Sequence, residues 1–164
     1  MVQIWVNLPK KHKMTDPKYQ SIKKSNIPTF TFSSSSNIRV IAGRYNNIVG
    51  PAKTFTEVNI YEISSKNKDE IVIKTNDNTN TLLLIMRGDI FIKNKLYKEK
   101  SIVIFDNKNL DLAFLAHKGF RGLIFNGKPL NEPLVSYGPF VMNTKEEISQ
   151  AIKDYQNGTM GRIT

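Results

Sequence analysis

Short apolar runs rich in β-branched and aromatic residues recur between residues 38 and 140. Clusters of Gly, Asn, Asp and Pro with turn chemistry separate these runs, and each run is short for a helix. Many short strands at close spacing are typical of an antiparallel sandwich or a closed barrel. The sequence therefore predicts an all-β domain with strands at 39–42, 54–63, 70–74, 82–86, 90–93, 102–105, 112–116, 123–125 and 134–137.

Two of the predicted strands depart from simple alternation of apolar and polar residues. The apolar positions of 54–63 cannot all share one face, which predicts a bulge or a change of register near Glu57. The run LLLIM at 82–86 is apolar on both faces. A strand of this kind is covered on both sides, so we expect it in the middle of the core.

The C-terminal region carries the pattern of one helix. Thr144 and Glu147 form a capping box, in which each side chain accepts a hydrogen bond from the backbone of the other residue. Gly158 stands where a helix commonly ends. An apolar stripe follows the box at helical spacing: Ile148, Ala151, Ile152 and Tyr155. We expect a helix over 144–157 that packs on the β-rich body through this stripe.

The first 36 residues differ from the β-rich body. Ile4, Trp5 and Val6 predict a short strand, and residues 9–24 carry six lysines against one acidic residue, Asp16. This Lys-rich segment is typical of a loop or an extended arm. Four consecutive serines at 33–36 then form a polar bridge. We therefore expect a strand and basic arm over 1–36, and a barrel with its terminal helix over 37–164.

Composition narrows the function classes further. The chain has 164 residues, a formal net charge of +10 and no Cys, which excludes disulfides, Cys-ligated metals and thiol nucleophiles. Lys and Asn are abundant almost everywhere, so the positive charge is a poor argument for nucleic-acid binding. The sequence shows neither a long apolar run nor a signal pattern. We expect a cytoplasmic protein, or a nuclear one in a eukaryote, with no membrane or nucleic-acid partner.

The candidate chemistry of the chain is sparse. His12 lies in the Lys-rich arm and His117 at a strand end, and two separated histidines do not build a multi-His metal site. The glycines at 122 and 127 with Lys128 resemble a phosphate-binding loop, but Pro129 replaces its Ser or Thr. We therefore assign no catalytic residue, no metal ligand and no cofactor to this chain.

Five stretches near the two ends of the chain are more specific than these short motifs. They are QIWVNLP at 3–9, PKYQ at 17–20, PLNEP at 129–133, YGPFVMNT at 137–144 and EEI at 146–148. Taken in this order, they resemble the segments that open and close the second half of pirin-family proteins. The two groups of stretches bracket nearly the whole chain.

The resemblance implies a fold, and it implies that the two barrels of a pirin have different roles. Pirins belong to the cupin superfamily and contain two tandem jelly-roll β-barrels. The first barrel binds Fe(II) through His and Glu residues and carries quercetin 2,3-dioxygenase activity in several members, whereas the second generally lacks metal. This chain resembles the second barrel alone and matches none of the metal ligands. The resemblance therefore implies a cupin-type jelly-roll barrel with one C-terminal helix.

Two functions remain open on this basis. The first is a metal-free C-terminal cupin domain that acts in protein association or regulation. The second is a subunit or fragment of a metal-dependent, quercetin 2,3-dioxygenase-like pirin, whose iron-binding barrel lies elsewhere. The first predicts a partner surface for a second copy of the chain or for a separately encoded N-terminal barrel.

Two sets of residues are candidates for a site. The flanking segments supply an apolar association surface, unless these side chains close the core of the chain itself: Trp5, Val6, Tyr19, Phe140, Val141 and Met142. A cupin barrel can also hold a small aromatic ligand in its interior without a metal. The expected contacts of such a ligand lie on or beside the strands: Met86, Arg87 and His117.

Overall fold

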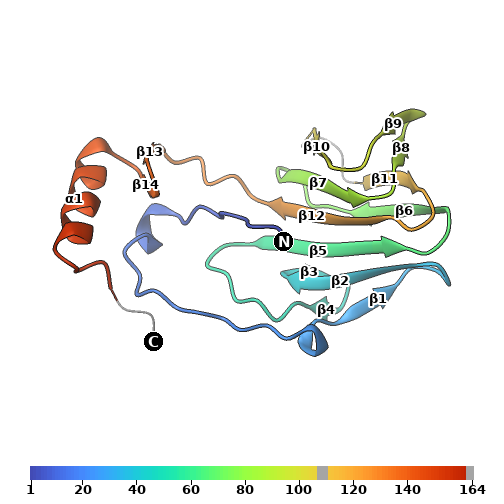
Figure 1. The fold of residues 1–164 in the computed structure, drawn as a ribbon, viewed down its shortest axis with the longest axis horizontal. Coiled ribbons are helices and arrows are strands. Elements are labelled where there is room, and N and C mark those ends of the chain that lie inside the picture. Colours follow the sequence, from blue (N-terminus) through green and yellow to red (C-terminus); the bar gives the residue numbers. More distant parts are fainter. Residues whose placement is uncertain (107–110, 162–164) are drawn as a thin grey trace. The chain divides into compact units, whose positions relative to one another are not determined.

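The computed structural model describes residues 1–106 and 111–161 and divides into two compact units. One unit combines Met1–Ser21 with Leu130–Thr164, and the other is Ile22–Pro129. We call them the terminal unit and the barrel unit (Figure 1). These divisions fall at other positions than the expected boundary after residue 36. None of the helices in the described ranges has the length and apolar character needed to cross a membrane.

The barrel unit consists of antiparallel strands in two main sheets (Figure 1). The larger sheet has six strands in the order β1-β2-β5-β12-β7-β10, and the smaller has four in the order β6-β11-β8-β9. A short hairpin, β3-β4, and a 3-10 turn at Lys24–Asn26 complete the unit. The strand bounds are β1 Thr29–Thr31, β2 Ser36–Ala42, β3 Arg44–Tyr45, β4 Ile48–Val49, β5 Val58–Ser65, β6 Asp69–Lys74, β7 Asn80–Arg87, β8 Ile90–Ile92, β9 Lys95–Tyr97, β10 Ser101–Phe105, β11 Asp111–Ala116 and β12 Arg121–Gly127.

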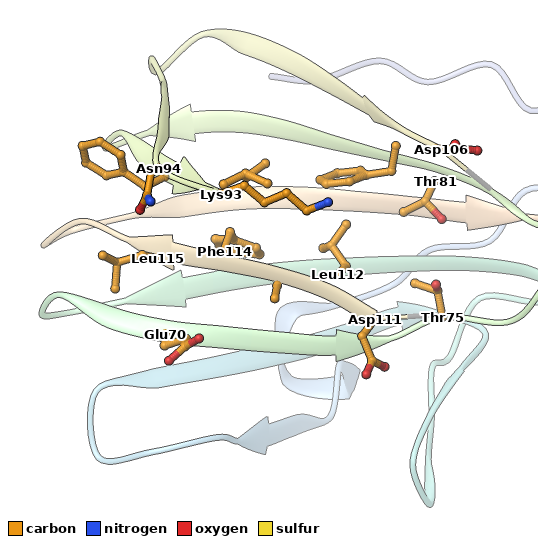
Figure 2. Close-up of a pocket in the computed structure, with 14 residues that line it drawn as sticks. Glu70, Thr75, Thr81, Lys93, Asn94, Asp106, Asp111, Leu112, Phe114 and Leu115 are labelled. Carbon is orange, nitrogen blue, oxygen red and sulfur yellow. The ribbon is translucent and has the colours of Figure 1, made fainter. Parts of the chain in front are cut away.

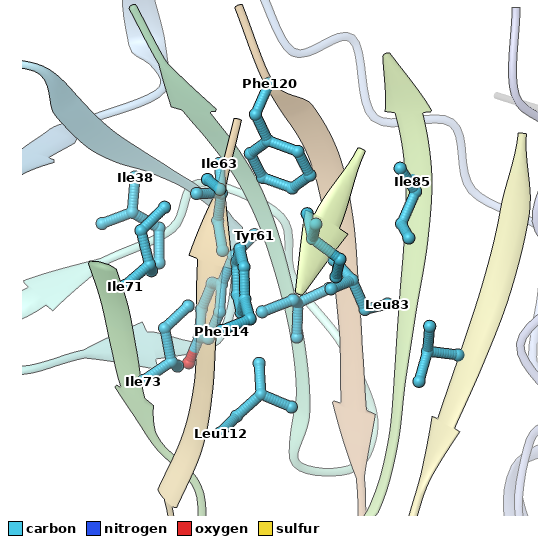
Figure 3. Close-up of a cluster of buried hydrophobic side chains, with 14 of the residues drawn as sticks. Ile38, Tyr61, Ile63, Ile71, Ile73, Leu83, Ile85, Leu112, Phe114 and Phe120 are labelled. Carbon is cyan, nitrogen blue, oxygen red and sulfur yellow. The ribbon is translucent and has the colours of Figure 1, made fainter. Parts of the chain in front are cut away.

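The core lies between the inward faces of the two main sheets (Figure 3). Alternate residues of each strand point inward, so Ile71 and Ile73 of β6 are fully buried while Val72 between them is exposed. The rings of Phe114 and Phe120 meet edge to face with centroids 5.4 Å apart. This arrangement confirms the prediction of an all-β, cupin-type fold with one α-helix.

The apolar pattern located most strands correctly, but three expectations were wrong. Residues 4–6 form no strand, and the strand expected at 54–63 begins only at Val58, without a bulge near Glu57. The register shifts of the larger sheet lie instead between Val40 and Ala42 of β2 and at the start of β12. On β7, Leu83 and Ile85 are fully buried, whereas Leu82 and Leu84 are half-buried. That strand is therefore covered completely on one face only.

The terminal unit contains a 3-10 turn (η1, Lys10–His12), a hairpin (β13, Val135–Tyr137; β14, Phe140–Met142) and the helix α1, Lys145–Gln156. The capping box is confirmed, because Glu147 N donates to Thr144 Oγ1 over 3.2 Å and Thr144 N donates to Glu147 Oε2 over 3.0 Å. Within the unit, α1 contacts the hairpin. Ile148 and Ala151 of the predicted stripe are buried, while Tyr155 is exposed.

The serine run at 33–36 forms a tight turn that is anchored to β6. Asp69 Oδ2 lies 2.5 Å from the hydroxyl oxygens of both Ser33 and Ser36. Ser33 Oγ in turn accepts hydrogen bonds from the backbone amides of Ser35 and Ser36 at 3.1 Å. The hydroxyl hydrogen bonds stabilise the charged carboxylate and lower the pKa of Asp69.

A second polar cluster lies on the outward side of the larger sheet. The buried carboxylate of Glu62 on β5 receives Arg39 Nη1 at 2.6 Å and Arg121 Nη2 at 2.5 Å, from the strands on either side. Each carboxylate oxygen therefore has its own guanidinium partner. Because a buried charge is costly without partners, the three side chains depend on one another.

Replacing Asp69 by Asn should weaken the serine turn. At neutral pH we expect the free energy of unfolding to fall by about 1 kcal/mol, since hydrogen bonds to a charged acceptor are lost. The lowered folded-state pKa of Asp69 stabilises the fold above the unfolded pKa of about 3.9, and this contribution disappears as the pH falls through the folded value. The difference between wild type and variant should therefore shrink below about pH 4. Urea unfolding at a series of pH values measures it, and a constant difference would contradict the assignment.

Replacing Glu62 by Ala should leave Arg39 unpaired at a site where its side chain is only 20% exposed. We expect a loss of about 3 kcal/mol in the free energy of unfolding. The matched control is Lys128→Ala, which breaks an exposed pair with Glu57 and should change stability by less than about 0.5 kcal/mol. Urea unfolding measures the free energy of unfolding of both variants. Equal losses would show that the Glu62 cluster stabilises the fold no more than an exposed ion pair does.

Candidate functional site

A cavity of about 340 Å³ opens in the wall of the barrel unit beside β11 (Figure 2). Strand β11 pairs with β8 at Leu115 and Ala116, and residues 111–114 extend beyond that pairing. Apolar side chains dominate the inner wall: Phe91, Ile92, Phe105, Leu112 and Phe114.

A lysine reaches into this cavity from the hairpin that joins β8 to β9. Lys93 and Asn94 form its two-residue turn, with φ values of 47° and 64°. Two consecutive positive φ values match a type I′ turn, whose twist suits an antiparallel hairpin. Figure 2 shows the Lys93 side chain extended across the pocket, near Leu112. The hairpin geometry thus carries a cationic group over an apolar wall.

The ligand contacts expected from the sequence lie elsewhere in the barrel unit, and none of them lines this cavity. Met86 alternates with the inward-facing Ile85, so it belongs to the outward face of β7. Arg87 Nε donates to the carbonyl of Gly119 over 3.0 Å. The His117 ring stacks on Phe91 with centroids 5.3 Å apart, and its backbone amide donates to Asp89 O. Arg87 and His117 therefore have structural contacts at the end of the barrel.

A second, polar cavity of about 580 Å³ lies beside the β3-β4 hairpin. Its buried amides bind one another: Asn59 Nδ2 donates to Asn126 Oδ1 over 2.9 Å, and Asn126 Nδ2 donates to Thr79 and Thr81. Tyr61 donates its hydroxyl to the carbonyl of Arg44, and burial raises the pKa of that phenol. These polar groups satisfy one another, which is typical of a network that fixes the fold.

The residues present do not fit a cupin metal centre. His12 lies in η1 of the terminal unit and His117 follows β11 in the barrel unit. Within residues 1–106 and 111–161, no three His, Cys, Asp or Glu side chains are grouped in a way that could hold a metal ion.

The outward face of the six-stranded sheet is apolar over much of its width. The strand register aligns two rows of side chains across it: Ile60, Phe125, Leu82 and Ile104, and Glu62, Leu123, Leu84 and Ile102. On the edge strand β10, Ile102 is 61% exposed and Ile104 is 77% exposed. We call this surface the outer apolar face. The apolar run at 82–86 was its signal in the sequence, where it predicted burial on both sides instead.

All six residues of the expected association surface belong to the terminal unit. Trp5, Val6 and Tyr19 are exposed, whereas the three residues of β14, which are Phe140, Val141 and Met142, are half-buried. The β14 residues line a groove of about 530 Å³ beside α1 with the methionines at 14 and 160. The Lys13 ammonium donates to the carbonyl of Val141 over 3.1 Å, which ties the N-terminal segment to the hairpin.

Comparison with known proteins identifies the fold. Residues 60–161 match the pirin C-terminal cupin domain. A Pseudomonas aeruginosa relative named after quercetin 2,3-dioxygenase is 34% identical over 159 residues, which are 96% of this chain and 56% of the relative. Pirin-1 of Arabidopsis thaliana is 30% identical over 166 residues, with 98% of this chain and 58% of the relative covered.

A solved structure agrees with these sequence matches. The crystal structure of quercetin 2,3-dioxygenase from Acinetobacter baumannii superposes with a TM-score of 0.91 at 34% identity, over 98% of this chain and 56% of that one. The chain thus spans about half the length of the relatives that it matches. The sequence-based resemblance is confirmed: the chain belongs to the pirin family and carries the family's C-terminal cupin domain.

Proposed function

We propose that this chain is the metal-free association half of a pirin, which docks on an iron-binding cupin barrel through its outer apolar face. The observation that carries the proposal is the exposure of Ile102 and Ile104, at 61% and 77%, at the β10 edge of the outer apolar face. Relatives of this chain are almost twice as long, so they contain a further segment of the size of a barrel. An apolar sheet face is a suitable surface for such a segment.

The outer apolar face has the chemistry of an interface. Its edge carries two branched aliphatic side chains, each of which gains roughly 1.5–3 kcal/mol on full burial. The Glu62 cluster borders this apolar area with fixed charges on β2, β5 and β12. Interfaces commonly combine an apolar centre with a polar rim of this kind. The exposed residues of the terminal unit, such as Trp5 and Tyr19, are a further candidate contact in the same role.

A second candidate function follows from the names of the relatives, two of which refer to quercetin 2,3-dioxygenase. In this version the docked pair is the enzyme, and the iron of the partner barrel supplies the oxygen chemistry. This chain would then position and shield the partner without touching the metal. Quercetin consumption that appears only when the two halves are mixed supports it, and a pair that forms without activity favours a regulatory half.

The docking surface can be tested with one charge on β10. We expect Ile104→Lys to weaken binding to a pirin N-terminal barrel at least tenfold, because docking would bury an unpaired ammonium. The matched control is Val72→Lys, which adds the same charge to an exposed position of the other sheet, 45% accessible in this chain. Analytical ultracentrifugation of this chain with the segment of the Acinetobacter baumannii protein that it does not cover gives the affinity.

Three outcomes of that experiment contradict the docking proposal. They are the absence of any complex, equal binding by the Ile104→Lys and Val72→Lys variants, and a homodimer of this chain alone that Ile104→Lys dissociates. The last result would assign the outer apolar face to a second copy of the chain instead of a separate barrel.

Metal analysis tests the proposal that this chain binds no iron. After purification in the presence of Fe(II), we expect less than about 0.1 iron per chain, since the described residues contain no grouped ligands. Elemental analysis by mass spectrometry measures this ratio. Stoichiometric iron in the isolated chain would overturn the metal-free assignment, whatever the docking experiment shows.

A further inference from the structure

We propose that the cavity beside β11 binds a flat aromatic monocarboxylate, with its ring against the phenylalanine wall and its carboxylate on the Lys93 ammonium. The cavity lies within the barrel unit and is separate from the outer apolar face, so this proposal does not depend on docking. Its volume of about 340 Å³ is that of a small-molecule site.

The wall of the cavity favours a ring. Phe114 and Leu112 are 2% and 4% exposed and form its fixed apolar surface. Phe91 from β8 and Phe105 from β10 add aromatic faces on neighbouring strands. Aromatic side chains stabilise a bound planar ring by more than the burial of its apolar area alone would. The strand edge at 111–114 extends beyond the pairing with β8, next to the same space.

The cation at the mouth of the cavity selects the charge of the ligand. Among the described residues, none forms an ion pair or a hydrogen bond with Lys93 Nζ, whereas Lys98, which follows β9, pairs with Asp89 at 2.9 Å. Turns of this type favour Asn or Gly at the position of Lys93. The conformation of the turn therefore gives no reason for a lysine at this position. A ligand carboxylate within reach of this ammonium would supply its missing partner.

Acidic residues at the rim limit the charge further. Glu70, Asp106 and Asp111 also line the cavity. In Figure 2 Asp111 points away from the pocket, while Lys93 extends across it. One cation that extends across the cavity, with three carboxylates among the lining residues, attracts a single negative charge and repels a second one. The site therefore fits a monoanion better than a dicarboxylate or a phosphate.

The experiment titrates the chain with cinnamate, and with cinnamamide as the neutral analogue of the same shape, by two-dimensional amide NMR. We expect cinnamate to bind at least fivefold more tightly than the amide and to shift the amide signals of 91–94 and 112–115. In Lys93→Gln the two probes should bind equally. The matched control, Lys95→Gln, removes a neighbouring ammonium that lies 5.4 Å from the Tyr97 ring centroid, and should keep the preference for cinnamate.

Lys93 lies in an exposed turn, so its replacement should leave the thermal midpoint unchanged, which circular dichroism checks. The proposal is overturned if neither probe binds, if wild type does not prefer the carboxylate, if Lys93→Gln keeps that preference, or if the shifted signals lie away from the cavity. Inorganic phosphate serves as an anion without a ring. Phosphate binding as tight as that of cinnamate would likewise contradict the role of the aromatic wall.

Discussion

The alternation of side chains along pleated strands is the constraint on which this molecule depends. Each strand of the six-stranded sheet sends every second residue into the core, which leaves the residues between them on the opposite face. The inward residues form a closed interior, and four of them are fully buried: Ile38, Ile63, Leu83 and Ile124. In β7 and β10 the opposite face is apolar too, half-buried on β7 and exposed at Ile102 and Ile104 of β10.

Glu62 separates a charged region of that outward face from an aliphatic one. The carboxylate and its two arginines, from β2 and β12, make the face polar around Glu62, while β7 and β10 remain aliphatic. A partner that covers the aliphatic region would meet a fixed pattern of charge at its border. In a docked complex, the buried ion cluster would therefore contribute more to the specificity for a partner than to the affinity.

The sequence predicted what depends on neighbours along the chain. The capping box at Thr144 and the apolar runs of the central strands follow from local chemistry, and the structure confirms both. Which face of a strand meets solvent depends on distant residues. The apolar run at 82–86 therefore could not show that one side of this strand belongs to the outer apolar face. Lys93 was missed too: the apolar pattern placed it at the end of the strand expected at 90–93, whereas it lies in the turn of a hairpin, and the wall opposite comes from residues 111–115. The strand expected at Ile4 failed because the described structure offers it no pairing strand.

The free edge of β10 also affects how the chain behaves in bulk. Within the described residues β10 pairs with β7 alone, so its other edge is a template for adding further strands, and neither Pro nor Lys interrupts residues 101–105. The net charge of +10 opposes such stacking, because every copy repels the next over a distance of about one Debye length. The abundance of lysine thus opposes aggregation of the chain, and this effect weakens as the ionic strength rises.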